Sequence, residues 1–231
     1  MSKLYCFGEV LWDLFPSGAK PGGAPMNVAI HGQNLGLESA VISAIGRDEY
    51  GDMLLHGSLA TRNNCSYESL KALRTRATTR VFDLNLRAPF IDSERILELL
   101  VGTEIVKVNE EEYELLAHWL QLDPNPEQGF DAMRKHFGTQ ELIVTRGGQG
   151  ALWINSLGAL QSKVFPVTVK DTVGAGDSFL AAMLYGISHF LEPQLTLDYA
   201  AALGAMVASK EGANPVISKT ELKAFIGASA Q

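Results

Sequence analysis

The sequence predicts an α/β fold with a largely parallel sheet and helices on both of its faces. Short apolar runs alternate with longer amphipathic runs, as expected of strands that alternate with helices. No internal repeat, low-complexity tract or charged tail interrupts this pattern. A chain of 231 residues, of which 46% are hydrophobic, is long enough for one large domain with a sizeable core. Length alone also allows two compact domains, whereas we expect a single domain over residues 1–231.

The individual elements follow from the length and period of these runs. The short apolar runs predict strands at Leu4–Val10, Ser39–Ile45, Arg80–Leu84, Glu104–Val108, Glu141–Thr145, Ala151–Ile154 and Leu160–Val164. The longer runs predict helices at Pro25–Leu35, Ser66–Thr75, Ser93–Leu100, Glu110–Trp119, Pro126–Phe137, Ala175–His189 and Leu195–Lys210. Proline at the start of a helix supports two of these predictions, because its fixed φ suits the first turn.

One stretch does not fit this alternation. Asp48–Leu55 indicates a helix, whereas Gly57–Ala60 indicates the end of a strand. The only apolar run upstream of that strand end is already used by the helix, and the same residues cannot serve both elements. The pattern indicates that a segment is absent between His56 and Gly57.

Composition excludes several classes of protein. The net charge is −7, from 26 acidic and 19 basic residues, which argues against broad binding to nucleic acid or to acidic membranes. No apolar run approaches the ~18 residues of a membrane span, and the first residues lack the core of a signal peptide. Cys6 and Cys65 have no metal-ligand spacing, and neither do the histidines, so we expect reduced thiols and structural histidines. These observations predict a soluble, cytoplasmic protein.

The strongest chemical signal is the run Asp171–Phe179. Glycines at 174 and 176 allow a sharp turn, and the apolar run that follows predicts a helix, so backbone amides of Gly174, Ala175 and Gly176 would point from its N-terminus. Such amides can stabilise negative charge on a transferring phosphoryl group, and Asp177 could accept a proton from a hydroxyl. A simple glycine turn with an aspartate cap explains the same residues.

A second glycine-rich turn opens the first predicted helix. Gly22 and Gly23 precede it, and Asn27 falls in its first turn, where an amide can both donate to and accept from sugar hydroxyls. Asp13 follows the first strand, near the sheet edge where open α/β folds bind ligands. A tight turn with a capping asparagine and a solvated loop acid is the alternative.

Further polar groups follow other predicted strands. Asp83, Asn85 and Arg87 alternate with apolar residues, so an extended segment would place them on one face, where the guanidinium suits a phosphate or carboxylate. Asn109 and Glu112 fit a helix-capping box, and Glu112 could alternatively hold Mg²⁺ through water.

The Thr145–Gly150 turn joins two predicted strands. It is either a hairpin turn with spare glycines or a loop over nucleotide phosphates. The chain contains no P-loop, no protein-kinase motif set and no nucleophile elbow.

The order of these segments resembles that of the ribokinase-like (PfkB) carbohydrate kinases. The resemblance runs from about Leu4 to Ile217 and rests on Gly22-Gly23-x-x-x-Asn27, Asp83-x-Asn85-x-Arg87, Asn109-x-x-Glu112, Thr145-x-Gly147-x-x-Gly150 and Asp171-Thr172-x-Gly174-Ala175-Gly176-Asp177. It implies a three-layer α/β/α fold and transfer of the γ-phosphate of ATP to a small sugar. The motifs look most like those of fructokinases, so fructose is the expected sugar, with 2-keto-3-deoxygluconate or another sugar or nucleoside as the alternative.

The resemblance also implies a role for each motif. Asp177 matches the catalytic base, and Gly174, Ala175 and Gly176 match the anion hole. The residues that match substrate contacts are Asp13, Gly23, Asn27, Asp83, Asn85 and Arg87. The nucleotide side is matched by Thr145, Gly147, Gly150 and Asn214, and the organisation of Mg²⁺ by Asn109 and Glu112. Asp171 and Thr172 lie where related enzymes often bind a monovalent cation such as K⁺.

The sequence departs from the family between His56 and Gly57. Relatives have several dozen more residues there, including strands of a small β lid that covers the sugar and often forms a homodimer contact. We expect that this segment is omitted from the sequence, because a true deletion would also remove a core strand. A true deletion would leave the alternative of an inactive sugar- or nucleotide-binding protein, since a closing lid excludes water from such a site.

Overall fold

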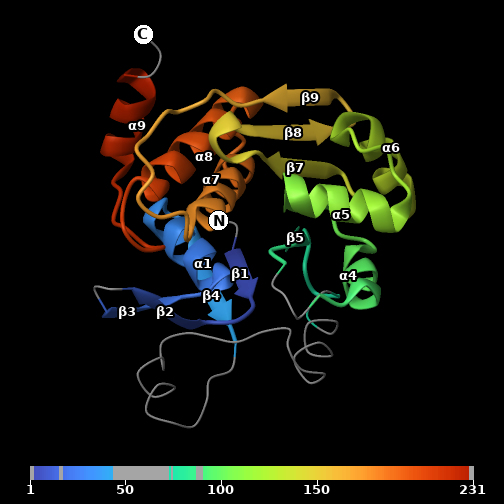
Figure 1. Cartoon of the computed structure of the whole chain (residues 1–231), viewed down its shortest axis with the longest axis horizontal. Helices are drawn as coiled ribbons and strands as arrows, with labels where there is room; N and C mark the ends of the chain where they lie inside the picture. Colours follow the sequence, from blue (N-terminus) through green and yellow to red (C-terminus); the bar gives the residue numbers. More distant parts are fainter. Residues whose placement is uncertain (1–2, 16–17, 44–72, 74, 87–90, 229–231) are drawn as a thin grey trace. The chain divides into compact units, whose positions relative to one another are not determined.

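The computed structural model describes residues 3–15, 18–43, 73, 75–86 and 91–228, traced from blue to red in Figure 1. These residues belong to two compact units. The split unit combines Met1–Lys71 with Val164–Gln231, and the central unit is Ala72–Lys163. A single domain over residues 1–231 stays a prediction.

The central unit is built on a five-stranded mixed sheet in the order β5–β6–β7–β8–β9. β5 (Val81–Asp83), β6 (Ile105–Asn109) and β7 (Glu141–Thr145) run parallel to one another, as predicted. β8 (Ala151–Asn155) and β9 (Gly158–Gln161) are antiparallel to their neighbours. The direction changes after β7 because the short turn that follows it can join only antiparallel strands, whereas a parallel connection needs a crossover.

Three helices of the central unit cover one face of this sheet: α4 (Ser93–Leu100), α5 (Glu110–Leu120) and α6 (Pro126–Phe137). Local sequence fixes where they begin. The Asp92 side chain caps α4 by accepting from the N–H three residues on, at 3.1 Å. Asn125 caps α6, with proline at the first helical position.

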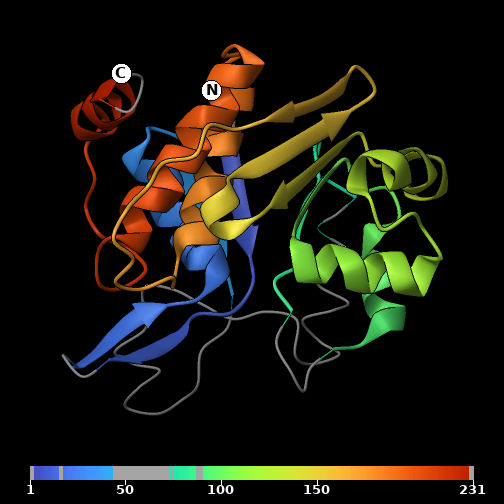
Figure 2. The ribbon, with the colours of Figure 1, turned by 45° about the horizontal axis from the view of Figure 1, so that its top comes forward.

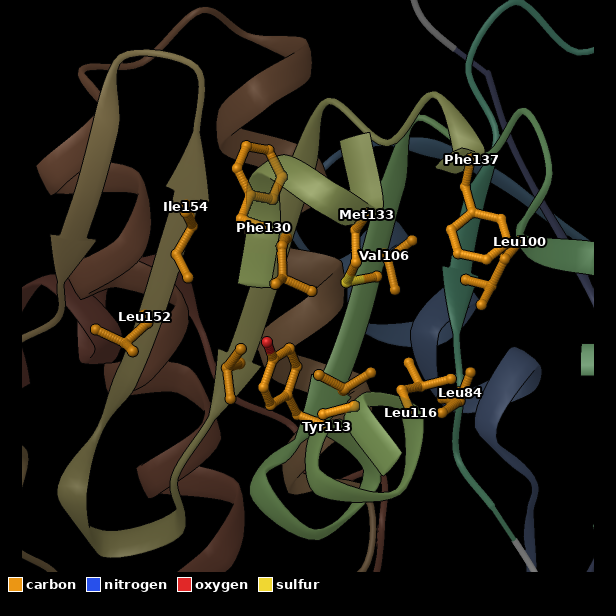
Figure 3. Close-up of a cluster of buried hydrophobic side chains, with 14 of the residues drawn as sticks. Leu84, Leu100, Val106, Tyr113, Leu116, Phe130, Met133, Phe137, Leu152 and Ile154 are labelled. Carbon is orange, nitrogen blue, oxygen red and sulfur yellow. The ribbon is translucent and has the colours of Figure 1, made fainter. Parts of the chain in front are cut away.

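The core of the central unit lies between these helices and the sheet (Figure 3). Its buried members are Leu84, Ile96, Leu100, Val106, Val108, Tyr113, Leu116, Ala117, Phe130, Met133, Phe137, Leu142, Val144, Leu152 and Ile154. Tyr113 is the one polar side chain in this set, and its hydroxyl donates to the Asp123 carbonyl at 2.9 Å. Full burial of each large aliphatic side chain contributes about 1.5–3 kcal/mol, so this cluster holds the helices against the strands.

The split unit contains two separate strand pairs. β1 (Lys3–Phe7) and β4 (Glu38–Ile42) are parallel, and α1 (Ala24–Asn34) lies between them in sequence and packs on both. β2 (Leu11–Phe15) and β3 (Gly18–Gly22) form an antiparallel pair. The path from β1 through α1 to β4 is the parallel crossover that the alternating pattern predicts.

The rest of the split unit is helical: α7 (Ala175–Ser188), α8 (Pro193–Ala208) and α9 (Lys219–Ala228). α7 packs against both α1 and α8, and α9 packs against α8; Figure 2 shows this group in a second view. A Cβ added at Gly186 of α7 would lie 2.4 Å from a side-chain carbon of Thr196 in α8. Glycine therefore permits the close approach of these two helices.

The structure corrects several predicted elements. β2, β3 and α9 were not predicted from the sequence. β3 was missed because its Gly-Ala-Lys-Pro-Gly sequence is typical of a turn, although proline is tolerated in an edge strand. The first strand ends at Phe7, before Gly8, where a Cβ would lie 1.9 Å from the Pro25 ring. The last strand, predicted at Leu160–Val164, occupies Gly158–Gln161.

Some predictions lie outside the described residues. These are the helix at Asp48–Leu55, most of the helix at Ser66–Thr75, the His56–Gly57 junction, Cys65 and Arg87.

Candidate functional site

The most specific motif forms the N-terminus of α7. Gly174 is the N-cap residue, with φ 77°, and a Cβ on it would lie 2.5 Å from the carbonyl oxygen of Ala213. The position therefore requires glycine both for its left-handed backbone and for its contact with the neighbouring segment. The N–H of Ala175 donates to the Thr172 carbonyl at 3.2 Å, and the N–H of Ser178 makes the first helical bond, to Gly174, at 2.8 Å. The amide of Gly176 lies between them in the first turn, where an α-helix offers no internal acceptor.

Asp177 is joined to the other glycine-rich motif by a direct hydrogen bond. Asn27 Nδ2, on α1, donates to Asp177 Oδ2 at 2.8 Å, and Asn27 is 2% exposed. Asn214 Nδ2 in turn donates to Asn27 Oδ1 at 2.7 Å. The carboxylate can only accept, so it fixes the orientation of the Asn27 amide, which then fixes that of Asn214. Asn27 and Asp177 lie 150 positions apart in the sequence, and the fold brings them together.

Asp171 ties the start of this motif to the same segment. Its Oδ1 accepts from the Val173 N–H at 3.0 Å, and its Oδ2 accepts from the Gly212 N–H at 3.0 Å. Thr172 is exposed, and its carbonyl is the acceptor for Ala175. Both Asp171 oxygens therefore shape the turn, and a K⁺ site at Asp171 and Thr172 stays a prediction.

Asp13 and Gly23 lie beside the start of α1. Gly23 is the N-cap of α1, with φ 112°, and a Cβ there would lie 2.4 Å from the Glu9 carbonyl oxygen. Asp13 is half-buried on β2, and its Oδ2 lies 1.9 Å from the position of a Cβ on Gly22. The carboxylate of Asp13 thus covers the glycine turn that leads into the helix of Asn27.

The electrostatic effect of Asp177 reaches β1. The pKa of the buried Cys6 thiol is raised to about 12, first by burial and then by the negative charge of Asp177. Cys6 is therefore a neutral thiol at physiological pH and supplies no nucleophile. It is a free, buried cysteine, in agreement with the reduced thiol expected from the sequence.

In the central unit, the predicted polar residues gather where the parallel strands end. β5 ends at Asp83, β6 at Asn109 and β7 at Thr145, and the register places Asn109 opposite Thr145. Parallel strands with their carboxyl ends at one edge are the arrangement at which open α/β sheets bind ligands.

Asp83 forms an ion pair that was not predicted from the sequence. Lys107 Nζ, on β6, lies 2.8 and 2.9 Å from the two Asp83 carboxylate oxygens, and the two side chains are 7% and 14% exposed. A lysine within an otherwise apolar strand was the signal that such a partner exists. Removing either member of the pair would leave a buried charge without its counter-ion.

Asn85 does not continue the extended strand. Its φ is 41°, so the predicted alternation of polar side chains on one face ends at Asp83. The expectation that Asp83 and Asn85 share a face by strand geometry is therefore wrong. The left-handed conformation suits asparagine, whose short side chain tolerates it better than most.

Asn109 and Glu112 form the predicted capping box. Asn109 Oδ1 accepts from the Glu112 N–H at 2.8 Å, and Glu112 Oε2 accepts from the Asn109 N–H at 2.9 Å. Glu112 Oε1 also accepts from the Leu86 N–H at 2.8 Å, and the residue is 7% exposed. Each carboxylate oxygen keeps a second lone pair, so contact with Mg²⁺ through water is compatible with the cap. No cluster of three or more His, Cys, Asp or Glu side chains able to hold a metal occurs among the described residues.

The Thr145–Gly150 turn is a tight hairpin with open space beside it. The N–H of Arg146 donates to the Gly150 carbonyl at 2.8 Å, and Thr145 Oγ1 donates to the Val108 carbonyl at 3.3 Å. A Cβ on Gly147 or Gly148 would meet nothing within 4 Å. The exposed, unobstructed backbone at these two glycines fits the approach of a nucleotide phosphate, whereas Gly150 is half-buried and a Cβ on it would lie 2.5 Å from Ser162 Oγ.

Comparison with known proteins identifies the family. Residues 57–220 match the family model described as pfkB family carbohydrate kinase, and this match begins directly after His56. A protein from Arabidopsis thaliana named "Probable fructokinase-6, chloroplastic" is 26% identical over 311 aligned positions, covering 94% of this chain and 80% of the relative. Because 311 positions exceed the 231 residues of the chain, the relative has residues without a counterpart here.

Three crystal structures share the fold. The fructokinase with bound ATP from Xylella fastidiosa has a TM-score of 0.79 at 21% identity and covers 99% of both chains. A candidate ribokinase II from E. coli in complex with ATP and Mg²⁺ has a TM-score of 0.82 at 21% identity, covering 99% of this chain and 100% of that chain. The 2-dehydro-3-deoxygluconokinase from Thermotoga maritima has a TM-score of 0.80 at 16% identity, covering 98% and 100%. They confirm the predicted ribokinase-like α/β fold. Among the described residues, no helix combines the length and apolar character needed to cross a membrane.

Proposed function

The chain belongs to the pfkB family of carbohydrate kinases and is a phosphotransferase, and we propose that it transfers the γ-phosphate of ATP to a hydroxyl group of fructose. The relative from Arabidopsis thaliana that carries the name of a fructokinase supports this choice of sugar. The ATP bound in the Xylella fastidiosa fructokinase supports the choice of nucleotide.

The hydrogen bond between Asn27 and Asp177 is the observation that carries the proposal. In the reaction, the sugar hydroxyl oxygen attacks the γ-phosphorus, the bond to the β–γ bridging oxygen breaks, and ADP leaves. Asp177 takes the hydroxyl proton, and Asn27 holds the carboxylate in position for that transfer. The backbone amides of Gly174, Ala175 and Gly176, at the N-terminus of α7, stabilise charge on the moving phosphoryl group.

Substrate and nucleotide contacts follow the motifs. On the sugar side we assign Asp13, Gly23, Asn27, Asp83, Asn85 and Arg87. On the nucleotide side we assign Thr145, Gly147, Gly150 and Asn214, with Asn109 and Glu112 holding Mg²⁺ through water. Bound Mg²⁺ would neutralise charge on the phosphates. K⁺ at Asp171 and Thr172, a cytoplasmic location, and a homodimer built through a lid remain part of the proposal.

The decisive experiment follows ADP release with fructose as acceptor and identifies the phosphorylated sugar by ³¹P NMR. Asp177→Asn should lower kcat by about 10²–10⁴-fold, because general-base catalysis contributes that much, and should leave ATP binding nearly unchanged. Full activity of this variant would remove Asp177 from the role of base.

A second sugar has specific structural support. The fold matches the 2-dehydro-3-deoxygluconokinase of Thermotoga maritima as closely as it matches the fructokinase of Xylella fastidiosa, with TM-scores of 0.80 and 0.79. A comparison of kcat/KM for fructose, 2-keto-3-deoxygluconate and ribonucleosides separates these acceptors, because specificity is a difference in transition-state binding. A higher kcat/KM for 2-keto-3-deoxygluconate would replace fructose in the proposal.

The shortness of the chain favours one alternative function, that of a sugar- or nucleotide-binding protein without kinase activity. The relative from Arabidopsis thaliana has residues without a counterpart here, and a protein that truly lacks them could bind sugar and ATP without turnover. Intact mass of the protein from its native source distinguishes the two cases. A mass well above 25.0 kDa, together with activity, supports the kinase with its lid, whereas a mass of 25.0 kDa without turnover supports the binding protein.

A further inference from the structure

His31 is a buried side chain that none of the assigned roles uses. It lies on α1, four residues after Asn27, so both side chains are on the same face of the helix. Each is 2% exposed. The sequence predicts a structural role for His31, because the histidines show no metal spacing.

The His31 ring makes one defined hydrogen bond. Its Nε2 lies 2.9 Å from the Ala213 carbonyl oxygen. A carbonyl can only accept, so Nε2 carries the proton and donates. Burial lowers the pKa of His31, although the bond to Ala213 opposes this effect, and the neutral ring protonated at Nε2 is the form that fits.

The segment that His31 contacts is held at every residue. Lys20 pairs with Glu211 at 2.7 Å, and Asp171 Oδ2 accepts from the Gly212 N–H at 3.0 Å. The carbonyl of Ala213 lies 2.9 Å from His31 Nε2. The side-chain amide of Asn214 donates to Asn27 Oδ1 at 2.7 Å. Four consecutive residues, here called the 211–214 clamp, are thus fixed by β3, by the loop before α7 and by two side chains of α1.

Two routes connect the clamp to Asp177, one through Gly174 and one through Asn27. Ala213 packs closely on Gly174, the N-cap of α7: a Cβ added to Gly174 would lie 2.6 Å from the Ala213 Cα. Asn214 donates to Asn27, which donates to the Asp177 carboxylate. Movement of the Ala213 carbonyl would therefore displace both the N-terminus of α7 and the amide that orients Asp177.

We propose that His31 is a positioning residue, which fixes the 211–214 clamp through the Ala213 carbonyl and thereby orients Asp177 for proton abstraction. The catalytic part rests on the proposed function, whereas the positioning part does not. Ala213 is 4% exposed, so its carbonyl would lose a buried donor, which is the condition under which a hydrogen bond matters most.

The test compares His31→Leu, which removes the donor, with His31→Gln, whose side-chain amide can still donate. Leu222→Ala is the matched control, because Leu222 is 1% exposed on α9, outside residues 211–214, and its truncation lowers stability without removing any hydrogen bond of the clamp. Hydrogen exchange by NMR reads the Gly212 and Ser178 amides, which donate to Asp171 and Gly174. His31→Leu should speed exchange at both amides at least about tenfold, and His31→Gln should stay within about threefold of the wild type.

The catalytic readout is taken on the same proteins. His31→Leu should lower kcat about tenfold with KM for ATP unchanged within about twofold, and His31→Gln should recover most of the rate. Leu222→Ala should lower the melting temperature and leave kcat within about twofold of the wild type.

Two outcomes would overturn the inference: unchanged exchange at Gly212 and Ser178 in His31→Leu, or equal acceleration there in Leu222→Ala. Failure of the proposed function is distinguishable from both. If the wild type phosphorylates none of the sugars, the kinase proposal fails, while the exchange measurements still decide whether His31 positions the clamp and α7.

Discussion

Replacing Gly174 with alanine tests the geometry at the start of α7 most directly. Its φ of 77° is left-handed, and such a backbone costs about 1–2 kcal/mol for alanine. The new Cβ would also lie 2.5–2.8 Å from three Ala213 atoms, of which two are backbone. Forcing atoms into such a packed site costs a further amount of about 1–3 kcal/mol. We therefore expect Gly174→Ala to lower the free energy of unfolding by about 2–5 kcal/mol.

Gly138→Ala is the matched control for this prediction. Gly138 has a φ of 80°, close to that of Gly174, but a Cβ on it would meet nothing within 4 Å. Urea denaturation followed by circular dichroism should show a loss of only about 1–2 kcal/mol for the control. If Gly174→Ala were no more destabilising than Gly138→Ala, the close contact with Ala213 would not exist in solution.

Two further predictions concern carboxylates of the central unit. Glu112→Ala removes the acceptor of two backbone amides and should lower the free energy of unfolding by about 2–3 kcal/mol in urea denaturation. The exposed neighbour Glu111→Ala should stay within about 0.5 kcal/mol, and equal losses would deny Glu112 its buried role. Hydrogen bonding to Arg80 lowers the pKa of Glu104 below its usual 4.5. The pair therefore stabilises the fold fully above pH 4.5, and this stabilisation is lost as the pH falls through the pKa of Glu104 in the folded protein. Glu104→Gln should accordingly lower stability by about 1 kcal/mol at pH 7, with the difference from the wild type shrinking in acid; a difference that grows in acid would contradict this sign.

The helices and most strands of the central unit were predictable because their signals are local. Pro126–Phe137 and Glu141–Thr145 have the predicted bounds, since a capping asparagine, a glycine at 138 and a short apolar run each act over a few residues. β3 was missed because its residues favour a turn, and the pairing with β2 overrides that preference.

The site divides in the same way. Asn27, Asp171 and Asp177 could be selected as candidates from the sequence, because glycine-rich turns before helices are visible as a spacing of residues. It could not identify Lys107 as the partner of Asp83, nor the contact of His31 with Ala213, since each partner lies on another element.

By itself, the sequence determined the family, the α/β class and the motifs, all of which are encoded in short-range spacing and in the order of segments. Only the tertiary structure decided how Asn214, Asn27 and Asp177 form one hydrogen-bonded series, and that Gly174 must be glycine to admit Ala213. The physical reason is that a hydrogen bond or a steric limit depends on distance in space. Asn27 lies 150 positions before Asp177 and 187 positions before Asn214 in the sequence. Packing of α1 against α7 brings the members of this series together, and no local pattern in the chain specifies that contact.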